Sequence, residues 1–85
     1  MHEMSLALEI GRIAELQAGP AVRNVITVGV DVGDEAGVEP ENLAFCLEAV
    51  LATSPFRRAK PVIARCAGDT LRVSYLEVDD ERPDD

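Results

Sequence analysis

The chain is poor in aromatic and basic residues, and this excludes several classes of partner. Its 85 residues contain two phenylalanines, one tyrosine and no tryptophan, and 16 acids against 8 lysines and arginines give a net charge of −8. Nucleic-acid binding depends on basic surfaces and often on stacking aromatic side chains, so we expect no nucleic-acid partner. No run reaches the roughly 20 continuous apolar residues of a transmembrane helix, and the first residues do not resemble a secretory leader. We therefore expect a cytoplasmic protein that does not bind membranes.

Cysteine and histidine are also scarce, which excludes most catalytic and structural metal sites. Cys46 and Cys66 are too few for a disulfide framework and lack the CxxC spacing typical of zinc sites, so we expect reduced cysteines, Cys46 in the core, and no zinc. The one histidine, His2, cannot form a Ser-His-Asp or Cys-His set around a pocket, and no glycine-rich phosphate loop is present. We therefore do not expect an enzyme.

The apolar residues, 47% of the chain, follow the periods of regular secondary structure. From Met4 to about Ala18 they recur at helical spacing, and the Gly19-Pro20 pair ends this predicted helix. Residues 22–32 instead alternate with period two, which is typical of a strand. The alternation places Ile26, Val28 and Val30 on the core face of the strand and leaves Val25 and Thr27 on the opposite face.

The second half of the chain predicts a helix and two more strands. Pro40, flanked by Glu39 and Glu41, fits the first position of a helix that ends before Pro55 and is apolar around most of its circumference, which indicates burial on more than one side. Residues 61–66 and 70–78 predict a β-hairpin, with a bulge near Ser74-Tyr75 that keeps the apolar residues in phase. The basic segment 56–60 between helix and hairpin is either a solvated loop, the favoured interpretation, or a docking patch for an acidic partner.

These elements, in the order helix, strand, helix, strand, strand, predict an α/β (α+β) fold. We expect a two-layer sandwich in which both helices cover one face of a three-stranded mixed sheet. The fold should occupy residues 1–78, followed by an acidic and disordered tail at residues 79–85. The partly apolar outer face of the sheet makes a homodimer plausible.

The first three residues, Met1-His2-Glu3, form a candidate metal site. The amine of Met1, the amide of His2 and the imidazole of His2 can reach one ion, and the amide of Glu3 could supply a fourth nitrogen in the same plane. Four nitrogens in a plane suit Ni(II) or Cu(II), whereas zinc prefers a tetrahedron. The sequence therefore predicts nickel or copper at Met1, His2 and Glu3.

Three motifs carry a resemblance to a known family. They are Met1-His2-Glu3-Met4-Ser5, Val38-Glu39-Pro40-Glu41, and the run from Gly68 to Val73 that continues to Glu77-Val78. Together they resemble the nickel-binding domain of the hydrogenase nickel-incorporation family (HypA/HybF). The resemblance implies that His2, with the Met1 amine and the Glu3 amide, holds Ni(II), and that the chain is a metallochaperone that delivers nickel to the [NiFe] hydrogenase large subunit with a GTPase accessory protein, or in some organisms to urease.

One departure from the family pattern bears on function. Family members insert a zinc domain with two CxxC pairs between the last two strands, where this chain has only Cys66-Ala67-Gly68. The chain could be a minimal nickel carrier. Alternatively, it is a paralogue without the zinc domain that serves as an interaction or regulatory module in hydrogenase maturation and delivers no metal.

Overall fold

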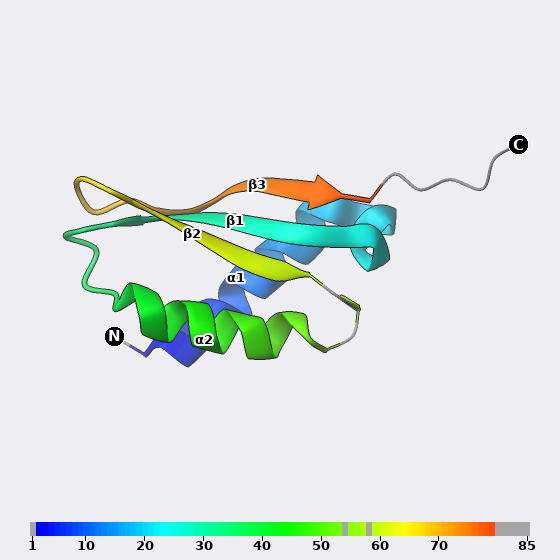
Figure 1. Ribbon diagram of the computed structural model, residues 1–85, viewed down its shortest axis with the longest axis horizontal. Helices are drawn as coiled ribbons and strands as arrows, with labels where there is room; N and C mark the ends of the chain where they lie inside the picture. The colour runs from blue at the N-terminus through cyan, green and yellow to red at the C-terminus, as the bar shows by residue number, and fades with distance from the viewer. Residues whose placement is uncertain (1, 54, 58, 80–85) are drawn as a thin grey trace, which may run out of the picture.

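The protein is a two-layer structure in which both helices lie on the same side of a three-stranded sheet (Figure 1). The computed structural model describes residues 2–53, 55–57 and 59–79. Along the chain follow α1 (Glu3–Ala18), a 3-10 helix η1 (Gly19–Asn24), β1 (Val25–Gly33), α2 (Pro40–Leu51), β2 (Lys60–Cys66) and β3 (Leu71–Val78). The predicted α+β sandwich and its element order are confirmed, with η1 occupying the first residues of the predicted strand.

The two helices bury one stripe each. In α1 the buried residues Ala7, Ile10, Gly11 and Ala14 recur every three or four positions, as an amphipathic helix requires. Gly11 lets the helices approach closely, because a Cβ atom there would lie 2.9 Å from Cγ1 of Val50 in α2.

Helix α2 buries less of its circumference than the sequence indicates. Its buried residues are Leu43, Cys46, Leu47 and Leu51, whereas the Phe45 side chain is 71% exposed. The expectation that this helix is buried on more than one side is therefore wrong, because only the stripe that faces α1 and the sheet is covered. The expected place of Cys46 in the core is confirmed.

The strand order β2-β1-β3 differs from the predicted hairpin. Strand β1 pairs in parallel with β2 and antiparallel with β3, so the last two strands lie on either side of β1 and do not pair with each other. Their short connection crosses the end of β1 and is bonded to it: the amides of Gly33, Asp34 and Glu35 donate to the carbonyls of Thr70 (2.6 Å), Cys66 (2.7 Å) and Gly68 (2.7 Å). The hairpin prediction is wrong because a link of four residues can cross the end of β1 to its far side, as well as turn back to form a hairpin.

Two bulges set the register between β1 and β3. Gly29 pairs with Tyr75 and Val30 with Val73, which leaves Ser74 as the extra residue and confirms the predicted bulge. A second shift falls between the Val25 and Thr27 pairs and was not predicted. It returns Val25 to the core face, so Val25 is fully buried and the expectation that it is exposed is wrong. The core is completed on β1 by Val28, Val30 and Val32.

The C-terminal end of the fold is held at Asp79. Its amide donates to the carbonyl of Asn24 at 2.8 Å. Residues 80–85, the rest of the predicted acidic tail, lie outside the described residues. In the part of the chain that is described, no helix has the length and apolar character needed to cross a bilayer.

Candidate metal site at the N-terminus

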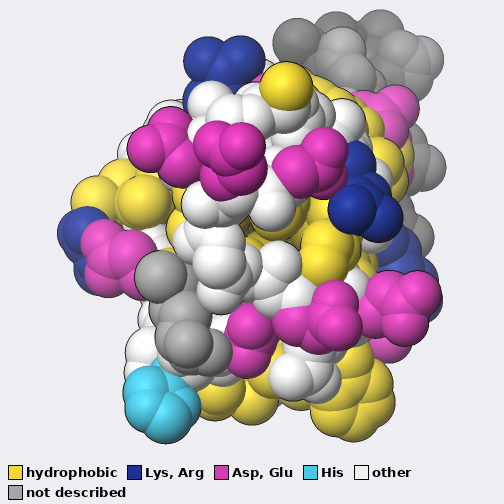
Figure 2. Space-filling view, turned by 90° about the vertical axis from the view of Figure 1, so that its left-hand side faces the viewer, with side chains coloured by type: hydrophobic (Ala, Val, Ile, Leu, Met, Phe, Trp, Pro, Cys, Tyr) yellow, Lys and Arg dark blue, Asp and Glu magenta, His cyan; other side chains and the backbone are white. Residues whose placement is uncertain are grey.

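His2 stands at the first turn of α1 with its side chain exposed. It is the N-cap residue, in extended conformation (φ −89°, ψ 106°), and its carbonyl accepts the amide of Leu6 at 3.2 Å. Figure 2 shows the histidine, in cyan, at the surface of this end of the molecule. Met1, the third member of the predicted site, lies outside the described residues.

The backbone amides around His2 are free of helical hydrogen bonds. The first amide that donates within α1 is that of Leu6, because the first residues of any α-helix lack a preceding carbonyl. The amides of His2 and Glu3 are therefore not part of the helical ladder. Losing either amide proton to a metal would break no backbone hydrogen bond of the helical ladder.

Glu3 differs from the sequence expectation. The predicted helix begins at Met4, but Glu3 is already the first residue of α1 and only His2 of the described pair precedes it. The carboxylate of Glu3 is also engaged, since its Oε2 accepts the backbone amide of Glu39 at 3.0 Å. This contact joins the starts of α1 and α2, which are 36 residues apart in sequence.

The electrostatics of Glu3 follow from this contact. The Glu39 amide, then the amide of Glu3 itself, lowers the pKa of the Glu3 carboxyl below its ordinary value of 4.5, and the Asn42 side chain adds to the effect. The carboxylate is thus ionised at neutral pH and stabilises the positive ends of two helix dipoles. It can contribute to a cation site through its charge while its amide remains the candidate ligand.

A shallow hollow of about 400 Å³ lies beside this contact and is lined by Glu39, Glu41 and Asn42. Figure 2 shows several acidic side chains gathered at this end of the molecule. Glu39 is the N-cap of α2 and Glu41 is in its first turn, which confirms their expected places at a helix start. Among residues 2–53, 55–57 and 59–79, no three His, Cys, Asp or Glu side chains group closely enough to hold a metal ion.

The two thiols are not part of this site. Both cysteines are free, with Cys46 in the core and Cys66 at the end of β2, where its carbonyl accepts the Asp34 amide. The donor atoms at Met1, His2 and Glu3 stay a prediction from the sequence, and the contact between Glu3 and Glu39 was missed. The Val38-Glu39-Pro40-Glu41 motif marked the right segment, yet local sequence gives no signal for a pairing across 36 residues.

Comparison with known proteins identifies the family of the chain. Residues 1–77 match the family described as "Hydrogenase/urease nickel incorporation, metallochaperone, hypA". Three similar proteins are each named "Hydrogenase maturation factor HypA". That of Geobacter metallireducens is 38% identical over 68 residues, covering 80% of this chain and 60% of the relative. The one from Albidiferax ferrireducens is 38% identical over 78 residues (91% and 69%), and the one from Streptomyces avermitilis is 40% identical over 75 residues (79% and 57%).

These matches define the class first: the chain is similar to a family described by nickel incorporation and to proteins named as hydrogenase maturation factors. It belongs to the HypA family. The chain spans about 60% of the length of the relatives from Geobacter metallireducens and Geobacter sulfurreducens. No solved structure matches it.

Proposed function

We propose that this protein carries Ni(II) as cargo for hydrogenase maturation and holds it at the N-terminus. The ligands are the amine of Met1, the amide and imidazole of His2, and the amide of Glu3. The observation that carries the proposal is the position of His2, an exposed residue that caps α1 while the amides around it make no helical hydrogen bond. Four nitrogen donors in a plane are the arrangement that Ni(II) favours.

The fold supports this site by fixing the residue that follows His2. Glu3 is tied to α2 through the Glu39 amide, so the chelating segment begins one residue beyond an anchored position. An exposed imidazole at such a point is open to a protein that receives the metal. The ionised carboxylate of Glu3 and the acids at the start of α2 favour a divalent cation nearby.

The family supports the remaining parts of the proposal. The recipient would be the large subunit of a [NiFe] hydrogenase or a urease, with a GTPase accessory protein as partner, in the cytoplasm. Residues 1–78 would form the nickel domain and residues 79–85 an acidic segment. We expect no zinc in this chain, because Cys46 is in the core and a lone Cys66 cannot supply four ligands. A homodimer through the outer face of the sheet stays a prediction.

The test is a titration of the untagged protein with Ni(II), followed by absorption spectroscopy. A square-planar Ni(II) complex of amine, amide and imidazole nitrogens gives a yellow, diamagnetic species. His2→Ala should lose that absorption, whereas Cys66→Ser should keep it, because the thiol is not a ligand. If His2→Ala binds nickel as the unaltered protein does, the nickel site lies elsewhere and the interaction-module alternative gains.

A further inference from the structure

Two arginines of the described chain have no acidic partner, although the protein carries an excess of acids. Arg23 and Arg57 make no ion pair with any residue the structure describes, and both are exposed. The other described basic residues are each paired: Arg12 with Glu9, Lys60 with Glu48, Arg65 with Asp34, and Arg72 with Asp31. Unpaired cations in a chain of net charge −8 are available for an external anionic group.

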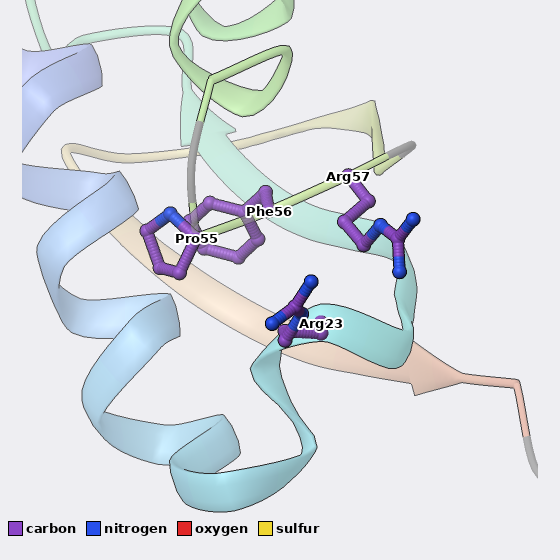
Figure 3. A pocket seen from close by; sticks show the side chains of 4 residues that line it. All are labelled: Arg23, Pro55, Phe56 and Arg57. Carbon is purple, nitrogen blue, oxygen red and sulfur yellow. The ribbon is translucent and has the colours of Figure 1, made fainter.

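Both unpaired arginines line the same cavity. It has a volume of about 300 Å³ and is formed by Arg23, Pro55, Phe56 and Arg57. Figure 3 shows Arg23 reaching up from the turn before β1 and Arg57 reaching down from the loop that precedes β2. Phe56 is only 4% exposed, so it anchors the loop that carries Arg57 in the core, and Arg23 of η1 lines the same cavity.

An apolar hollow continues from this cavity between the two helices. It measures about 200 Å³ and shares Pro55 and Phe56 with the arginine cavity. The other side chains around it are Leu8, Arg12, Glu15, Val50 and Thr53, with Gly11 leaving room at the helix contact. Leu8 is 59% exposed, a large apolar side chain with no cover in the described structure. We call the two hollows together the docking surface.

We propose that the docking surface binds a segment of a partner protein in which an apolar side chain is followed by carboxylates. The apolar side chain would fill the hollow beside Leu8, and the carboxylates would pair with Arg23 and Arg57. Arginine forms bidentate hydrogen bonds with carboxylates, and a neighbouring apolar contact displaces water from such a pair. The chain's own residues 79–85 supply carboxylates but only Pro83 as an apolar group, so they match the arginine cavity and not the apolar hollow beside Leu8.

The position of the docking surface suits a protein that must also present a metal. Pro55 follows the end of α2, whereas Glu39, which bonds Glu3, precedes its start. A helix of 12 residues is about 18 Å long, so the arginine cavity beyond the end of α2 lies far from the Glu3–Glu39 contact at its start. A partner docked beside Phe56 would leave the N-terminus uncovered. The proposal therefore does not depend on nickel binding.

The experiment measures fluorescence anisotropy of a labelled peptide that has a pair of leucines followed by a run of aspartates, titrated with the full chain. Replacing both arginines (Arg23→Gln with Arg57→Gln) should weaken binding about tenfold, because two exposed charge pairs are lost. Arg65→Gln removes the same kind of charge elsewhere and should change little. Binding should also weaken as salt is added.

The apolar half is tested with a matched pair of variants on α1. Leu8→Gln should weaken binding of the leucine peptide, but not of a peptide whose leucines are replaced by serines. Leu16→Gln alters a side chain of similar exposure, 68%, that does not line the docking surface, and should have no effect. Circular dichroism of each variant confirms that the fold is kept.

Three results would overturn the proposal. The first is no binding of the leucine-aspartate peptide at millimolar concentration. The second is equal weakening by Arg65→Gln and by the paired arginine substitutions, which would indicate unspecific charge attraction. The third concerns the acidic segment of the same chain: if neutralising it (Asp80→Asn, Glu81→Gln, Asp84→Asn, Asp85→Asn) tightens peptide binding many-fold, that segment is the occupant and the partner assignment is wrong.

Discussion

The crossing of the β2–β3 connection over the end of β1 can be tested at Gly33. A Cβ atom added to Gly33 would lie 2.2 Å from the carbonyl oxygen of Gly68 and 2.7 Å from the amide nitrogen of Thr70. Both obstacles are backbone atoms, so no side-chain rotation relieves the overlap. Gly33→Ala must therefore push the connection away from β1.

The expected loss follows from the bonds that hold this crossing. Three backbone hydrogen bonds join residues 33–35 to the carbonyls of Cys66, Gly68 and Thr70. Each contributes roughly 0.5–1.5 kcal/mol net, and alanine restores part of a kcal/mol by restricting the unfolded chain. We expect Gly33→Ala to lower the free energy of unfolding by about 2–3 kcal/mol. For a domain of this size that corresponds to a fall in Tm of roughly 10–20 °C.

Urea unfolding measured by circular dichroism checks the value, and Gly29→Ala is the matched control. Gly29 is also a buried glycine of β1, but the atoms nearest to a Cβ there belong to the ring of Tyr75, which is 47% exposed and can move. Its substitution should change the unfolding free energy by about 1 kcal/mol or less. If Gly33→Ala is as stable as the unaltered chain, or Gly29→Ala is the more harmful change, the crossing is not arranged as described.

Three further predictions address the bulge, the Glu3 contact and the metal site. Val25→Ala should cost about 2 kcal/mol of unfolding free energy in the same urea assay, because Val25 is fully buried. Val62→Ala, at a 45% exposed strand position, should cost much less. Equal costs would contradict the bulge between Val25 and Thr27. Because folding lowers the pKa of Glu3, the stability that its carboxylate contributes is present above pH 4.5 and is lost as pH falls through the lowered pKa. Glu3→Gln should therefore flatten the dependence of Tm on pH in that range. An unchanged dependence would mean that the Glu39 contact contributes nothing to stability. Extending the chain ahead of Met1 should weaken nickel binding sharply in a calorimetric titration, and unchanged affinity would show that the amine is not a ligand.

The fold could be predicted from the sequence where the signal is local. The periodicity of residues 4–18 and the stop at Gly19 gave α1, and the phase change of apolar residues in the last strand gave the bulge at Ser74. Non-local features were missed. The alternation along β1 predicts Val25 on the outer face of the sheet. The bulge between the Val25–Val78 and Thr27–Glu77 pairs turns the Val25 side chain to the core face instead. The apolar circumference of residues 40–51 predicts cover on more than one side, yet no element of the described chain covers α2 at Phe45.

The candidate site divides in the same way. The donor atoms proposed at Met1 and His2 depend only on covalent spacing, so this prediction needs the sequence alone, and it stays a prediction. The position of Glu3 depends on the Glu39 amide, which the fold brings within 3.0 Å. A contact of this kind requires the packing of α1 on α2, and no sequence periodicity encodes it.

Helix α2 connects the two proposals. Its side chains Leu43, Leu47 and Leu51 are fully buried, which fixes the helix on the sheet along its whole length. Glu39 at one end and Pro55 beyond the other are therefore held at a constant separation, and of the described residues neither His2 nor Glu3 lines the docking surface. Sites separated in this way usually behave additively. Peptide bound at Arg23 and Arg57 should thus leave nickel affinity unchanged, and a partner held there would gain access to the metal through proximity, because the docked complex raises the local concentration of its nickel acceptor.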